Sequence, residues 1–164
     1  MKTLIVYYSL EGNTEYAVGR ISEATGADVL RIVPKKAYKD RGLGKFLSGG
    51  RSAVMAEAPD LQPYDARLDE YDRIIFGTPV WASSFAPPLR TFILENSDDL
   101  EGKHFAAFAC QSGSGAEKAL AKLKTLIGTG AFEAEAVFTD PKSRPSESAE
   151  RAIDGFIARL TGRE

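Results

Sequence analysis

Five strand-like runs separated by helix-like segments constrain the fold of this chain more than any other feature. Most of the runs are rich in β-branched or aromatic residues, and they cover Thr3–Tyr8, Ala27–Val33, Arg73–Gly77, Phe105–Cys110 and Phe132–Phe138. Apolar residues recur at helical spacing between these runs, and again after the last one over Ile153–Leu160. Alternating strands and helices predict an α/β fold, in which a parallel sheet lies between two layers of helices.

The apolar content of each run predicts its place in the sheet. A central parallel strand is covered on both faces and is therefore continuously apolar, as in Leu4–Tyr8, Ile74–Phe76 and Phe105–Cys110. Charged residues interrupt the second and fifth runs, so these two are expected to form the edges. With right-handed crossovers the simplest strand order is 2-1-3-4-5. In this order a ligand binds at the carboxyl ends of strands one and three, where the topology switches direction.

Composition narrows the class of protein further. The 164 residues are expected to form a single domain, 1–164, that buries roughly 70% of the surface its unfolded chain exposes. One cysteine and one histidine exclude a disulfide framework and leave no cluster of zinc ligands. A net charge of −2, from 21 basic and 23 acidic residues, argues against nucleic-acid binding. The sequence shows neither a signal peptide nor a membrane-spanning run, so we expect a cytoplasmic protein without a membrane partner.

The segment Pro34–Tyr71 is long for one crossover between neighbouring strands. It is interpreted as an irregular second helix, with a flap near the ligand as the alternative. The apolar residues that suggest the helix are Leu43, Phe46, Leu47 and Val54. The glycines that would weaken it are Gly42, Gly44, Gly49 and Gly50. Basic residues gather over Lys35–Arg51 and acidic residues over Glu57–Asp72. A solvated surface is the simplest explanation of both groups, with two adjoining charged patches as the alternative.

The turn after the first run has the composition of a phosphate-binding site. An apolar strand ends at Ser9, and a short turn through Gly12 leads to Thr14 and a helix-like sequence. The N-terminus of a helix binds dianions through its backbone N–H groups and its positive dipole end. A glycine lets the backbone approach the phosphate closely. The turn therefore predicts a site for a phosphate-bearing cofactor, and the alternative is a simple helix N-cap.

Two further loops are expected to meet this turn, because the loops after parallel strands leave the sheet at the same edge. The loop Gly77–Ser84 contains the only tryptophan, Trp81, which suits either stacking on a flat conjugated ring or sealing the end of the sheet. The loop Cys110–Gly115 contains Gly113 and Gly115, which let backbone groups approach the heteroatoms of a ring. Together the three loops predict a site for a phosphate, a flat ring and a polar edge.

These residues resemble the flavodoxin-like family of FMN-binding proteins along nearly the whole chain. The turn Ser9-Leu-Glu-Gly-Asn-Thr14 is similar to the family pattern Ser/Thr-x-Thr-Gly-x-Thr, and Gly77-Thr-Pro-Val-Trp-Ala and Cys110-Gln-Ser-Gly-Ser-Gly are similar to its other two loops. The lack of a long insertion within Phe132–Phe138 resembles the short-chain flavodoxin branch. The resemblance implies FMN and a three-layer sandwich around a five-stranded parallel sheet of order 2-1-3-4-5. The implied cofactor-binding residues are Ser9, Leu10, Glu11, Gly12, Asn13, Thr14, Thr78, Pro79, Val80, Trp81, Ala82, Cys110, Ser112, Gly113 and Gly115.

Two features depart from the family pattern. Glu11 stands where the family often has threonine, and its carboxylate repels a phosphate dianion unless it points into water. Reduced phosphate affinity is therefore expected. The loop Gln111–Gly115 has no aromatic residue, whereas many flavodoxins cover both ring faces with aromatic side chains. One ring face is expected to be open, or covered only by Phe85 or by residues 35–58.

The resemblance implies two functions, and the sequence leaves both open. The first is an electron carrier, whose FMN exchanges electrons one at a time with a redox partner protein. The second is an NAD(P)H-dependent reductase of quinones or other small acceptors. The near-neutral charge counts against a carrier, since carriers of the family are strongly acidic, and no GxGxxG fingerprint supports a nicotinamide site. The carrier is the primary interpretation, and the chain is expected to be a monomer or a homodimer.

Other functions are disfavoured by the positions of particular residues. A signalling receiver needs an aspartate at a central strand end, where this chain has Ser9, Gly77 and Cys110. Gly44-Lys45-Phe46 lacks the spacing of a P-loop. His104 is expected roughly 20 Å from the site, at the opposite end of its strand, and is excluded as an acid or base. Cys110 lies at the site but is expected to pack rather than to react.

Overall fold

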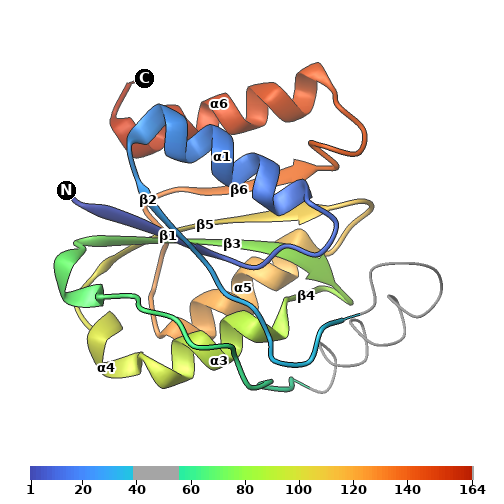
Figure 1. Ribbon diagram of the computed structural model, residues 1–164. Coiled ribbons are helices and arrows are strands. Elements are labelled where there is room, and N and C mark those ends of the chain that lie inside the picture. The colour runs from blue at the N-terminus through green and yellow to red at the C-terminus, as the bar shows by residue number, and fades with distance from the viewer. Residues whose placement is uncertain (39–55, 164) are drawn as a thin grey trace.

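A computed structural model of the chain describes residues 1–38 and 56–163. The centre of the molecule is a parallel sheet (Figure 1). Its parallel strands are β1 (Thr3–Tyr7), β2 (Asp28–Arg31), β3 (Arg73–Trp81), β5 (His104–Gln111) and β6 (Glu135–Thr139). They lie side by side in the order β2-β1-β3-β5-β6. The predicted fold class is confirmed, and β1 and β3 are neighbours as the switch point requires.

Among the described residues the sheet has six strands, not the predicted five. The additional strand β4 (Ser84–Phe85) pairs antiparallel with the end of β3, with Trp81 opposite Ser84. As a result β3 continues to Trp81, where the sequence predicted a loop beginning at Gly77. Beyond Gly77 the strand β3 has left its neighbour β1, and a proline such as Pro79 is tolerated in a strand at such an edge. The predicted run Ala27–Val33 is longer than β2 at both ends, and the predicted run Phe132–Phe138 begins before β6 does and ends one residue earlier.

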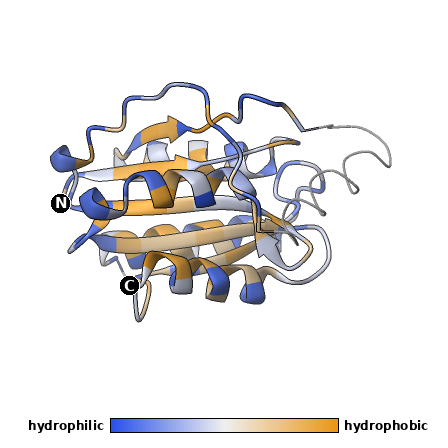
Figure 2. Cartoon of the chain, turned by 90° about the horizontal axis from the view of Figure 1, so that it is seen from below, coloured by the Kyte–Doolittle hydropathy of each residue, from blue (hydrophilic) through white to orange (hydrophobic). Residues whose placement is uncertain are grey.

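Helices cover both faces of the sheet (Figure 1). On one face lie α1 (Asn13–Thr25) and α6 (Glu147–Thr161), and on the other lie α3 (Pro87–Glu95), α4 (Ser97–Leu100) and α5 (Ala116–Ile127). Each face has its own apolar core, because a central strand turns alternate residues to opposite sides. Ile5 and Ile75 pack toward α1 and α6, whereas Val6 and Ile74 pack toward the other layer. Figure 2 shows the matching pattern, with apolar central strands and hydrophilic residues on the outer sides of the helices.

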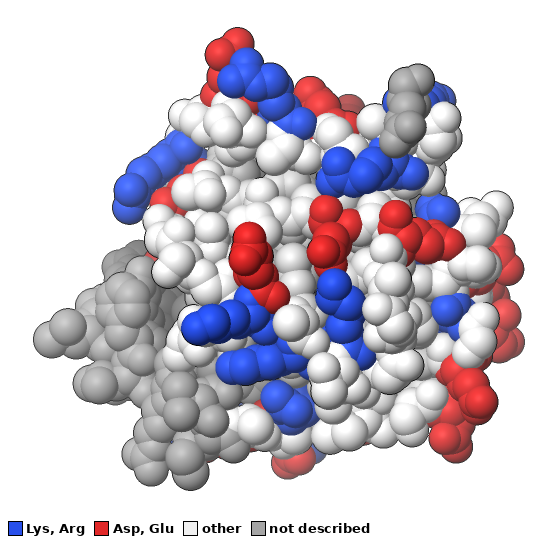
Figure 3. Space-filling view, turned by 180° about the vertical axis from the view of Figure 1, so that it is seen from behind, with Lys and Arg blue, Asp and Glu red and all other residues white. Residues whose placement is uncertain are grey.

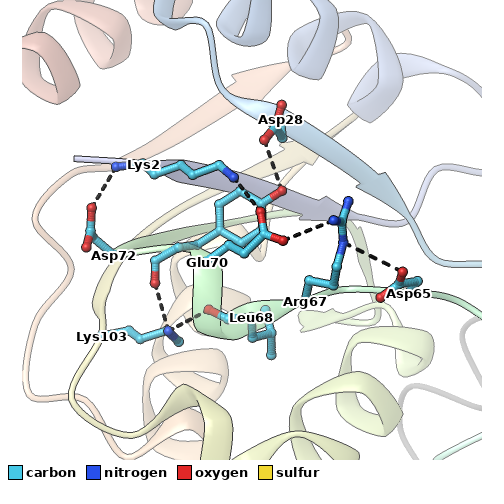
Figure 4. Close-up of polar contacts among 9 residues, drawn as sticks. Lys2, Asp28, Asp65, Arg67, Leu68, Glu70, Asp72 and Lys103 are labelled. Carbon is cyan, nitrogen blue, oxygen red and sulfur yellow. Dashed lines mark hydrogen bonds and ion pairs between the residues drawn. The ribbon is translucent and has the colours of Figure 1, made fainter.

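The amino end of the sheet is closed by charged residues that pair with one another (Figure 4). Lys2 Nζ contacts Glu70 Oε2 at 2.6 Å, and Arg67 Nη1 contacts the same carboxylate at 3.0 Å. Lys103 Nζ donates to the carbonyl oxygens of Leu68 and Tyr71, both at 2.7 Å, and so holds the 3₁₀ turn η1 (Leu68–Glu70) against β5. Exposed pairs of this kind contribute little stability each.

The described part of the long crossover between β2 and β3 contains the 3₁₀ turn η1 and no α-helix. Pro34 and Leu61 form an antiparallel bridge, and the backbone N–H of Lys35 donates to the carbonyl of Asp60 at 2.8 Å. The predicted helix over residues 43–54, its glycines and most of the basic group Lys35–Arg51 lie outside the described residues. Within the described parts of the chain, no helix combines the length and the apolar content needed to cross a membrane.

Candidate functional site

A cavity of about 580 Å³ lies at the carboxyl ends of β1, β3, β5 and β6. Its volume is within the usual range for sites that bind a small molecule or cofactor. The structure brings together the three predicted segments there. All the predicted cofactor-binding residues line the cavity except Gly12, Thr78 and Gly115, and the lining also includes Gln111, Ser114, Asp140 and Arg144, which were not predicted.

The turn after β1 presents the N-terminus of α1 to the cavity. Gly12 is the N-cap residue with φ +96°, a conformation that favours glycine. Ser9 Oγ accepts a hydrogen bond from the N–H of Glu15 at 3.3 Å. The turn therefore also caps the N-terminus of α1, as the alternative interpretation of its sequence predicted. The N–H groups of Asn13 and Thr14 belong to the first turn, where no intrahelical acceptor exists. Glu11 is exposed to solvent, which is the condition under which its carboxylate interferes least with an anion.

The second wall of the cavity is the hairpin formed by β3 and β4. Trp81 is half-buried at the cavity edge, and its ring centroid lies 5.6 Å from that of Tyr8 and 5.0 Å from that of Tyr38, both in edge-to-face geometry. Tyr38 belongs to the segment 35–58, so this segment contacts the aromatic side of the site. Phe85 is 1% exposed, packs in the core and does not line the cavity. The expectation that Phe85 covers a ring face was therefore wrong, because β4 turns this side chain inward.

Thr78 and Gly115 act by holding the walls together. Thr78 Oγ1 accepts a hydrogen bond from the N–H of Ala86 at 2.9 Å and so joins the two arms of the β3–β4 hairpin. Gly115 is the N-cap of α5 with φ +102°. A Cβ atom on Gly115 would lie 2.6 Å from Ser83 Oγ and 3.0 Å from Ser83 Cα. The hairpin turn and the third loop therefore meet at a contact that only glycine permits.

A fourth segment, Asp140–Arg144, follows β6 and was missed at the sequence level. Asp140 is 3% exposed, and its Oδ1 accepts a hydrogen bond from Ser112 Oγ at 2.7 Å. Its Oδ2 has no hydrogen-bond partner among the described residues and lies 3.4 Å from Arg144 Nε. The sequence predicts the fifth run as an edge strand and assigns no site residue to the loop after it. The rule that brings the other loops together applies equally to Thr139-Asp140-Pro141, so the signal was present.

The cavity has no reactive thiol at neutral pH. Cys110 is buried, and burial raises the pKa of its thiol from 9.0 to about 12, with the nearby charge of Asp140 acting in the same direction and a hydrogen bond with Thr14 opposing it. The thiol therefore stays protonated, which fits a packing role. His104 lies at the opposite end of β5, where its Nδ1 contacts Glu133 Oε1 at 2.5 Å.

The strand order and a cavity at the switch point define a flavodoxin-like α/β protein. A family model described as Flavodoxin matches residues 2–149, and the chain belongs to this family. The match confirms the resemblance that the three loops indicated.

Solved structures of similar fold include proteins that contain flavin. A candidate flavoprotein from Bacteroides uniformis ATCC 8492 is 26% identical, with a TM-score of 0.73 over 93% of this chain and 97% of that chain. A flavoprotein from Lactobacillus acidophilus NCFM, solved in complex with FMN, is 18% identical, with a TM-score of 0.73 over 94% and 97% of the two chains. The two-electron reduced flavodoxin of Megasphaera elsdenii is 21% identical, with a TM-score of 0.58 over 96% and 98%.

Proposed function

We propose that this protein binds FMN in the cavity and carries electrons between partner proteins. The donor set of the cavity suits each part of that cofactor. The first-turn N–H groups of α1, with the hydroxyls of Ser9 and Thr14, suit the phosphate. The ring of Trp81 suits stacking against the flavin. Asp140 Oδ2 is a buried acceptor that has no hydrogen-bond donor among the described residues, and the hydroxyl groups of the ribityl chain are donors of this kind.

The observation that carries the proposal is that the described residues lining the cavity include no histidine, and that the one thiol among them stays protonated. When bound, FMN supplies the reversible uptake of electrons. In the part of the chain that the structure describes, the titratable side chains of the cavity are Glu11, Cys110, Asp140 and Arg144. Cys110 stays protonated, and the histidine lies at the other end of β5. A carrier needs no group that titrates near neutral pH, because its residues only bind the cofactor and limit its contact with water.

The surface charge supports recognition of a partner by shape more than by long-range attraction. The net charge is −2. Basic and acidic side chains are interspersed on the face seen in Figure 3, without one sign dominating it. Strong steering requires a surface of one sign. A partner protein is therefore expected to associate with only modest dependence on salt.

A second function, reduction of small acceptors with NAD(P)H, is favoured by one observation. Trp81 is the only aromatic residue among the described residues that line the cavity. One face of a bound flavin is therefore left without an aromatic cover from these residues, and a nicotinamide or a quinone needs such an open face for direct hydride transfer.

The experiment that tests the proposal has two stages. The purified protein is first titrated with FMN and its visible spectrum is recorded; failure to take up FMN would refute the flavin assignment. The FMN form is then mixed anaerobically with NADH or NADPH alone. A carrier keeps its yellow colour until dithionite or a reduced partner protein is added, whereas bleaching within minutes by the nicotinamide alone identifies a reductase.

A further inference from the structure

We infer that Arg144 is a ligand of the cofactor phosphate, and that it exchanges Asp140 for the phosphate when FMN binds. This inference rests on the FMN site proposed above. It assigns a cationic side chain to a cradle that the sequence pattern describes only by hydroxyls, glycine and backbone N–H groups.

The position of Arg144 follows from hydrogen bonds that join its segment to the phosphate turn. Asn13, the first residue of α1, accepts hydrogen bonds at Oδ1 from the backbone N–H groups of Lys142 at 2.9 Å and Ser143 at 3.0 Å. Its Nδ2 donates to Ser143 Oγ at 3.1 Å. The segment after β6 is thus fixed directly against the N-terminus of α1. Arg144 is the next residue along the chain, and it lines the same cavity as Thr14.

The present partner of Arg144 is a weak one. Its Nε lies 3.4 Å from Asp140 Oδ2, which makes an ion pair but no hydrogen bond. The Arg144 side chain is 77% exposed, whereas that of Asp140 is 4% exposed. Holding a long exposed side chain in such a pair brings little free energy. A guanidinium has five N–H donors in a planar fork and binds phosphate oxygens in pairs. A dianion at the N-terminus of α1 is therefore the stronger partner.

The same segment balances the charge of Glu11. Lys142 Nζ lies beside the turn, since a Cβ atom on Gly12 would be 2.6 Å from it. Arg144 lines the cavity, whereas Lys142 lies on the outer side of the same turn. The segment after β6 therefore places two positive charges beside a turn that carries the negative charge of Glu11, and of the two it is Arg144 that faces the site.

The test compares FMN with riboflavin, which has the same ring and ribityl chain but no phosphate. Both flavins are titrated by fluorescence quenching into the wild type, Arg144→Gln, Arg144→Lys and the control Arg151→Gln. Arg151 is an exposed arginine on α6 that pairs with Glu147 at 3.2 Å. Loss of a charge-assisted phosphate contact predicts about 10- to 100-fold weaker FMN binding in Arg144→Gln. Riboflavin binding should be unchanged, Arg144→Lys should recover part of the loss, and the control should match the wild type.

The other outcomes distinguish this inference from the proposed function. If Arg144→Gln weakens both flavins equally, Arg144 acts on the ring site or on the fold, and the phosphate role is refuted. If it weakens neither, Arg144 stays with Asp140 and the exchange is refuted while the FMN proposal stands. If the wild type binds neither flavin, the proposed function fails and this inference fails with it.

Discussion

The contact between Gly115 and Ser83 holds together two walls of the cavity, and it can be tested with a matched pair of glycines. Helix α5 begins after Gly115, with φ +102°, and ends before Gly128, with φ +79°. A Cβ atom on Gly115 would lie 2.6 Å from Ser83 Oγ and 3.0 Å from Ser83 Cα. A Cβ atom on Gly128 would have nothing within 4 Å among the described residues. Alanine at the two positions therefore shares the backbone strain but not the steric clash.

The expected free energies follow from these two contributions. Positive φ costs an alanine about 1–2 kcal/mol, and this is the whole effect at Gly128. Overpacking adds about 1–3 kcal/mol at Gly115, so Gly115→Ala should destabilise by about 3 kcal/mol. For a chain of this size that corresponds to a fall in Tm of about 6–12 °C. The fall for Gly128→Ala should be about half as large.

The measurement is urea and thermal unfolding of both variants, followed by titration with FMN. Ser83→Gly removes the nearest atom, Ser83 Oγ, so Gly115→Ala should cost about 1 kcal/mol less in that background. FMN affinity should fall for Gly115→Ala and stay near the wild-type value for Gly128→Ala. Equal destabilisation by the two alanines, with no coupling to Ser83, would refute the claim that this contact joins the walls.

Three further outcomes are expected. Trp81→Ala should weaken FMN binding about 10-fold, since it removes the aromatic surface that lines the cavity; undiminished affinity in a fluorescence titration would contradict the stacking role. Ala82→Gly should raise Tm by about 2–4 °C, because Ala82 has φ +48° in a two-residue hairpin turn, and an unchanged Tm would show that the turn is not strained. The native Cys110 thiol should resist alkylation at pH 8, whereas the urea-unfolded chain should react within minutes. Burial raises the pKa of the Cys110 thiol from 9.0 to about 12. The contribution of this thiol to the free energy of unfolding should therefore be constant below pH 9 and decline between pH 9 and 12, where only the unfolded thiol ionises. A free energy of unfolding that stays flat across that window would argue against the shift.

The features that the sequence predicted well are those written locally in the chain. Continuous apolar runs identify strands buried on both faces, and charged interruptions identify edges, because burial acts on each side chain separately. The order of the parallel strands follows from these runs together with the handedness of crossovers. The convergence of the loops after β1, β3 and β5 follows in turn, since parallel strands end at the same edge.

The features that it predicted poorly depend on pairing between distant segments. Pro79 by itself disfavours a strand. However, β3 continues past Pro79 because β4 folds back and pairs with Val80 and Trp81. Phe85 was one of two candidates to cover a ring face that was otherwise expected to be open, but the same pairing turns it into the core. No local pattern distinguishes a glycine that contacts a ligand from one that, like Gly115, makes room for Ser83.

The sequence by itself determined the class of fold, the strand order and three walls of the cavity, because hydrophobic burial and chain connectivity act through local patterns. The common edge of parallel strands also places the loop after β6 at the site, but only the tertiary structure decided which of its side chains line the cavity. Asp140 and Arg144 are ordinary charged residues in the sequence, and they become part of the site because α1 and α6 pack on the same face of the sheet. That packing brings Ser143 to Asn13, and this contact between segments far apart in the chain places the charge of Arg144 at the cavity.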